Sequence, residues 1–98
     1  MKSTKKLSIT LLQNRPNPFD EATTISVLVE RPVDYQQALI RVADTQGREL
    51  ARYPIELKQG LIEVLYGYEK HGYQRGTYYY SLVIDGRVYD TKAMVYAY

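Results

Sequence analysis

Hydrophobic and polar residues alternate along much of this chain, and a period of two is typical of a strand with one buried face. Four segments show the alternation clearly, at residues 24–30, 38–43, 62–66 and 77–84. Each apolar row predicts the core-facing side of one strand. The residues that we expect in the core are Ile25, Val27, Val29, Ile40, Val42, Val64, Tyr78, Tyr80 and Leu82.

Three further segments are weaker strand candidates. Residues 7–13 and 88–98 are rich in β-branched and apolar residues at the two ends of the chain. Residues 48–57 contain Pro54, which has no N–H to donate to a ladder and therefore suits an edge strand or a bulge. Residues 78–84 carry apolar side chains on both faces, so we expect them to form a central strand that is buried on both sides.

Turn residues fall between these segments. Asp85-Gly86 is a two-residue hairpin signal, and Asp44 to Gly47 predicts a second tight turn with Gly47 in the left-handed region. Residues 67–76 form a longer polar loop, while two prolines exclude a helix or a central strand at residues 14–18. About seven short strands with turns at this spacing predict an all-β fold, an immunoglobulin-like antiparallel β-sandwich.

The amino-acid composition and the net charge exclude several classes of function. A chain of 98 residues is one small domain, and the absence of cysteine excludes a disulfide framework, a thiolate zinc site and a cysteine nucleophile. The net charge of +2 is dispersed, so we expect no nucleic-acid partner. No stretch approaches the roughly 20 apolar residues of a membrane helix, so we expect no transmembrane segment.

Residues that carry chemistry are sparse. His71 is the single histidine and has no nucleophile or orienting carboxylate at an informative spacing, while Asp20-Glu21 is an isolated acidic pair. We therefore expect no enzymatic activity, no cofactor and no metal. Three of the eleven tyrosines lie near the long loop, where aromatic rings could stack on a sugar. These less constrained tyrosines are Tyr66, Tyr68 and Tyr73.

Several motifs, in order along the chain, resemble one family. Residues 11–19 read Leu-Leu-Gln-Asn-Arg-Pro-Asn-Pro-Phe and are followed by Ala-Thr-Thr-Ile at residues 22–25. This opening resembles that of the type A C-terminal sorting domains of the type IX (Por) secretion system. The later motifs that are similar to the family are Ala38 to Asp44, Gly47 to Leu50, Gly76 to Leu82 and Thr91 to Val95.

The resemblance implies a non-catalytic sorting signal of Bacteroidetes-type bacteria. Residues 11–98 would be the sorting domain, and residues 1–10 a flank or linker with the start of the first strand. The implied partners are a fused upstream cargo protein, the type IX translocon, and outer-membrane shuttle and sortase components. The implied location is the periplasm in transit, then the cell surface or the medium. The alternative is an immunoglobulin-like adhesion or carbohydrate-binding module.

The motif residues are candidates for either recognition or structure. We expect Phe19 to cap one end of the sandwich and Met94 to point inward, with Lys92 on the same side of its strand. Lys92 is either a solvated charge that blunts a sheet edge or a recognition contact. The full set is Asn14, Pro16, Asn17, Pro18, Phe19, Asp44, Gly47, Arg48, Gly76, Tyr78, Lys92 and Met94.

Overall fold

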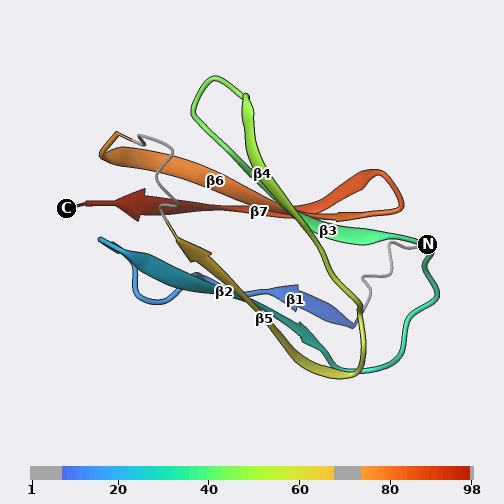
Figure 1. The fold of residues 1–98 in the computed structure, drawn as a ribbon. Helices are drawn as coiled ribbons and strands as arrows, with labels where there is room; N and C mark the ends of the chain where they lie inside the picture. Colours follow the sequence, from blue (N-terminus) through green and yellow to red (C-terminus); the bar gives the residue numbers. More distant parts are fainter. Residues whose placement is uncertain (1–7, 68–73, 98) are drawn as a thin grey trace, which may run out of the picture.

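Two antiparallel sheets pack face to face in the computed structural model, which describes residues 8–67 and 74–97 (Figure 1). A three-stranded sheet has the order β1-β2-β5, and a four-stranded sheet has the order β4-β3-β6-β7. The chain is therefore an all-β sandwich, as expected. The strands are β1 (Ile9–Leu11), β2 (Ala22–Val29), β3 (Ala38–Ala43), β4 (Glu49–Pro54), β5 (Gly60–Gly67), β6 (Gly76–Ile84) and β7 (Arg87–Tyr96).

The strand order is that of an immunoglobulin-like Greek key. β2 pairs with β5 and β3 pairs with β6, so both central pairings join strands that are distant in the sequence. β4 pairs with β3 in the four-stranded sheet and leaves β5 with β2 as its single partner strand. This arrangement differs from the constant-type immunoglobulin domain, in which the fourth strand lies beside the fifth.

The core forms between the two inner faces and confirms eight of the nine expected residues. Ile25, Ile40 and Leu82 are completely buried, as the alternation predicts. Val64 is the exception, since it is only partly buried. It lies on β5, at the edge of its sheet, where none of the described strands flanks its outer side.

Two strand predictions need correction. The first strand is shorter than residues 7–13, because only Ile9–Leu11 pair with β2. β6 is central in its sheet but is not buried on both faces, since Thr77 and Tyr79 are exposed on its outer side. No second layer covers that side of a sandwich, so an apolar residue there does not imply burial. The expected edge strand is confirmed, and Pro54 is its last residue.

The predicted turns are confirmed by the backbone. Asp85 and Gly86 have φ angles of 52° and 82°, which is the positive pair that a type I′ hairpin requires. The Asp85 carboxylate also accepts hydrogen bonds from the backbone N–H groups of Gln36 and Gln37, at 2.8 and 2.9 Å. These bonds hold the β2–β3 connection against the hairpin. In the long polar loop, residues 68–73 lie outside the described residues.

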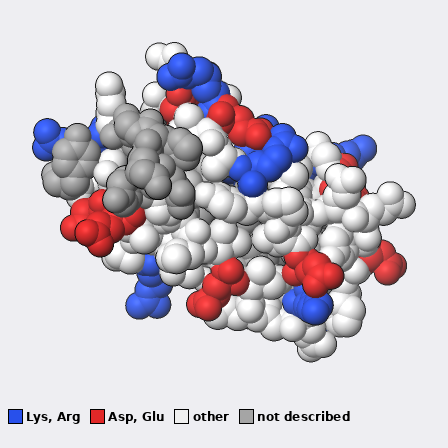
Figure 2. All heavy atoms as spheres, viewed as in Figure 1, with Lys and Arg blue, Asp and Glu red and all other residues white. Residues whose placement is uncertain are grey.

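Acidic and basic side chains are interspersed on the face shown in Figure 2. Within the described residues, no helix is long and apolar enough to cross a membrane.

Candidate functional site

The connection between β1 and β2 crosses from one sheet to the other. Its first part stays with the three-stranded sheet, because the Arg15 and Thr24 backbones exchange two hydrogen bonds of 3.0 and 2.8 Å. Its last part joins β7 of the four-stranded sheet. There the Phe19 N–H donates to the Val95 carbonyl at 3.0 Å, and the Ala97 N–H donates to the Phe19 carbonyl at 2.8 Å. We call residues 13–19 the motif segment.

A buried polar cluster fixes the shape of the motif segment. Asn14 is completely buried, and its Nδ2 donates to Thr23 Oγ1 at 2.9 Å and to the Pro16 carbonyl at 3.1 Å. The Thr23 hydroxyl donates to the same carbonyl at 2.8 Å, and Asn14 Oδ1 accepts from Gln13 Nε2 at 2.7 Å. Because a buried amide without partners is costly, these bonds account for asparagine at this position.

Two side chains of the motif segment form hydrogen bonds with the outer edge of β7 near its end. The Val95 N–H donates to Asn17 Oδ1 at 2.9 Å, and Gln13 Nε2 donates to the Ala93 carbonyl at 2.7 Å. Both prolines, Pro16 and Pro18, follow cis peptide bonds. The motif segment therefore serves as a partner for the outer edge of β7.

Phe19 fills the space between the sheets at this end, as expected. Its exposed fraction is 2%, and its ring centroid lies 6.2 Å from that of Tyr66 and 5.3 Å from that of Tyr96. The contact with Tyr66 is edge-to-face, a favoured aromatic geometry. Since Tyr66 belongs to β5 and Tyr96 to β7, Phe19 joins the two layers.

The terminal strand has the predicted orientation. Met94 is completely buried opposite Tyr78, and Lys92 is partly buried opposite Tyr80 on the same side of β7. Lys92 thus lies toward the interior and must extend its ammonium group to water past apolar surface. The two interpretations of Lys92, edge charge and recognition contact, both stay predictions.

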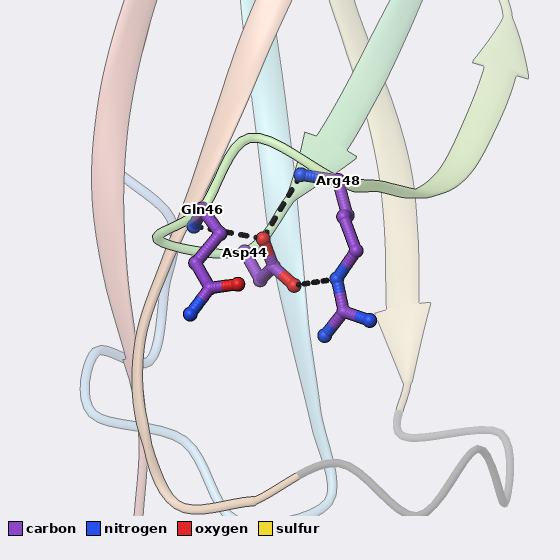
Figure 3. Close-up of polar contacts among 3 residues, drawn as sticks. All are labelled: Asp44, Gln46 and Arg48. Carbon is purple, nitrogen blue, oxygen red and sulfur yellow. Dashed lines mark hydrogen bonds and ion pairs between the residues drawn. The ribbon is translucent and has the colours of Figure 1, made fainter.

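The motifs at residues 38–44 and 47–50 meet in the turn between β3 and β4, which Figure 3 shows. Asp44 Oδ1 accepts from the backbone N–H groups of Gln46 and Arg48, both at 2.9 Å, and Oδ2 accepts from Arg48 Nε at 2.9 Å. The bond from the Arg48 backbone is the main cause that lowers the pKa of Asp44. Gly47 has a φ of 85°, a conformation that glycine adopts without a steric cost.

The motif at residues 76–82 lies beside this turn. Gly76 has a φ of 138°, which L side chains rarely adopt, and the Tyr78 hydroxyl donates to the Gln74 carbonyl. Tyr78, Asp44 and Arg48 line one open hollow of about 620 Å³. The start of β6 and the end of β7 are paired, so the Asp44 turn and the start of β6 lie at the same end of the sandwich as Phe19. We call this the motif end.

The structure describes some of the residues considered for other functions. Tyr66, expected to be accessible for sugar stacking, is 1% exposed, because its side chain belongs to the inner face of β5. Tyr68, Tyr73 and His71 lie outside the described residues. Asp20 and Glu21 are both exposed, and within residues 8–67 and 74–97 no group of three metal-ligating side chains forms.

Sequence reasoning missed several residues of this site. Gln13 and Thr23 hold the motif segment, yet neither is among the candidate residues singled out above, although both stand in the motifs quoted there. Tyr80 was predicted only as core, but its hydroxyl also donates to the Leu12 carbonyl at 2.6 Å, across the sandwich. Hydrogen bonds between the two sheets depend on tertiary packing, so no local sequence pattern predicts them.

The Tyr80 hydroxyl predicts a loss of stability in alkali. Burial raises the pKa of Tyr80 to about 12, with a smaller contribution from the Asp90 charge and an opposing one from the Asn14 backbone N–H. Between pH 10 and 12 the unfolded chain ionises at this tyrosine while the folded chain does not. The free energy of unfolding therefore falls as the pH rises from 10 to 12, by on the order of 1 kcal/mol per pH unit.

Urea denaturation at pH 9, 10 and 11 measures this effect against Tyr80→Phe. The variant should lose about 1 kcal/mol at pH 9, because the Leu12 carbonyl loses its donor. Its stability should then fall less steeply than that of the wild type. Parallel pH profiles for the two proteins would contradict the assignment.

Comparisons of the chain with family models, with curated proteins and with solved structures find no match.

Proposed function

We propose that this chain is a sorting domain of the type IX secretion system, which directs a fused cargo protein across the outer membrane. One observation carries the proposal beyond the resemblance. The motif segment and the terminal strand, which the resemblance marks independently, hydrogen-bond to each other through Asn17, Gln13 and Phe19. The Asp44 turn and Tyr78 lie at the same end. A recognition surface built from these motifs would therefore be contiguous.

The motif end is also suited to recognition by shape. Asn14 and Phe19 are buried, so they act through the fold, while Asn17 and Arg48 are exposed. A translocon component would meet the exposed residues on a rigid frame. No catalytic group is needed for such a role, and the partners would be the cargo, the translocon and its shuttle and sortase components.

An export assay tests the proposal. Residues 1–98 are fused behind a signal peptide and a fluorescent protein, and expressed in a bacterium that has the type IX system. We expect the fusion at the cell surface or in the medium, and the fluorescent protein without the domain in the periplasm. Periplasmic retention of a folded fusion would contradict the proposal.

Deletion of the terminal strand is not a clean test of the signal. Removing residues 93–98 would take Met94 and Tyr96 from the core and leave the motif segment without its partner. Lys92→Ala is cleaner, because Lys92 is only partly buried. If Lys92 is a recognition contact, export should fall while the denaturation midpoint stays unchanged; unchanged export identifies an edge charge.

The carbohydrate-binding alternative loses one of its three tyrosines, since Tyr66 is buried. Titration of the protein with a glycan panel separates the two functions. A sorting domain should show no saturable binding.

A further inference from the structure

Among the described residues, three of the four outer edges of the two sheets are protected. The motif segment covers residues 93–96 at the end of β7, and the rest of that strand carries Arg87, Asp90 and Lys92 and a register shift against β6. β1 is only three residues long, and the Tyr89 hydroxyl donates to its Ile9 carbonyl at 3.0 Å. β4 ends in Pro54, carries the ion pair of Arg52 with Glu49, and has a register shift against β3. Short length, proline, charge and bulges are the devices that prevent unwanted strand pairing.

The fourth edge, on β5, carries almost none of these devices. β5 is eight residues long, contains no proline and has one charged residue, Glu63. Among the described residues, none outside β2 forms a hydrogen bond with the backbone of residues 60–65. Leu61 and Leu65 are 55% and 71% exposed on the outer face. An edge of this kind is a template for an added strand.

The outer face of β5 indicates which side chains an added strand would carry. Leu61 and Leu65 lie on either side of Glu63, each two residues away. Glu63 lies opposite Ser26 on β2, and no described lysine or arginine forms an ion pair with it. An added strand would form favourable cross-strand pairs if it placed a basic residue beside Glu63 and apolar residues beside the two leucines.

A second copy of this chain fits the edge poorly. Antiparallel self-pairing that sets Leu61 against Leu65 also sets Glu63 against Glu63 of the other copy, and like charges directly opposite each other are destabilising. Registers shifted by two residues set Glu63 against a leucine. The glutamate therefore disfavours self-association and favours a basic partner.

We propose that the β5 edge binds an extended segment of a partner protein, in which a lysine or arginine lies two residues from an apolar residue on each side. Backbone hydrogen bonds to residues 60–65 would supply affinity, and the Leu61, Glu63 and Leu65 side chains would supply selectivity. This inference is independent of the proposed export function.

The probe is an acetylated and amidated peptide, Thr-Val-Thr-Lys-Thr-Val-Thr, titrated into the ¹⁵N-labelled protein. We expect saturable shifts of the backbone amide resonances of residues 60–65. The same peptide with glutamate in place of lysine should bind roughly three- to tenfold more weakly. Glu63→Lys should invert this preference, which no purely structural role of Glu63 would do.

The double variant Leu61→Thr and Leu65→Thr should weaken binding of the lysine peptide about tenfold, since threonine keeps β propensity but removes the apolar contact. Val88→Thr, at a 54% exposed valine on the other sheet, is the matched control and should bind as the wild type does. Absent binding, equal binding of the two peptides, or shifts that map to β4 would overturn the proposal. If the wild-type protein is a dimer and the double variant is a monomer, the β5 edge binds a second copy of the chain. That result would also overturn the proposal.

Discussion

Phe19→Ala is expected to lower the free energy of unfolding by about 3–5 kcal/mol. The ring is 2% exposed and contacts Tyr66 and Tyr96, which belong to different sheets. Its removal leaves a cavity between the layers and forfeits two aromatic contacts. A domain of this size has about 5–10 kcal/mol in total, so the variant should be close to unfolding at 37 °C.

Urea denaturation at 25 °C measures this loss, with Val88→Ala as the control. Val88 is 54% exposed, and its truncation should change the free energy of unfolding by less than about 0.5 kcal/mol. A Phe19→Ala loss below 1 kcal/mol would contradict the structural role of the ring. Unchanged stability together with lost export would make Phe19 a recognition contact.

Asn14→Asp is expected to cost about 3 kcal/mol or more at pH 7. In the wild type, Nδ2 donates to the Pro16 carbonyl and to Thr23 Oγ1, inside a completely buried site. An aspartate oxygen at that place would meet the Pro16 carbonyl oxygen without a proton between them. Burial would also raise the pKa of the new carboxyl group above its unfolded value.

That shift gives the Asn14→Asp variant a characteristic pH dependence. A raised folded pKa means that the deficit is present at neutral pH and shrinks as the pH falls and the carboxyl group takes up a proton. The pKa values of Asp44 and Asp85 are lowered by hydrogen bonds from backbone N–H groups, so the stability that they contribute is lost only below about pH 4. Comparison at pH 7 and pH 5 therefore isolates the new group.

Asn17→Asp is the matched control for this substitution. Asn17 is exposed and uses only Oδ1, which accepts from the Val95 N–H, and aspartate keeps that acceptor. We expect a change of less than about 0.5 kcal/mol. Equal losses for the two variants would contradict the assignment of Asn14 as the buried support of the motif segment.

The alternation of apolar and polar residues predicts well which residues form strands. It predicts poorly where each strand lies within its sheet. Alternation identifies Ile25 and Ile40 as core residues because strand period and burial are coupled directly. It does not tell which strand lies at an edge, so Val64 is more exposed than expected and Tyr79 lies on an uncovered face. Pro54 marks β4 as an edge strand, but β5 carries no such residue, and its edge position follows from how distant strands pair.

The candidate site shows the same division. The prolines and Phe19 predict a rigid plug between the sheets, and the ring is buried there. The bonds of Asn17 and Gln13 to β7 span 78 and 80 residues of the sequence. These hydrogen-bond partners are set by the packing of the two sheets, so local sequence patterns do not predict them.

The location of the cargo fusion in two otherwise identical strains tests the central claim most directly. One strain has the type IX translocon and the other lacks it, and both produce the fluorescent protein fused to residues 1–98. The proposed sorting role predicts surface or extracellular fluorescence only in the strain with the translocon, and periplasmic fluorescence in the other. A fluorescent, folded fusion that stays in the periplasm of both strains would contradict it.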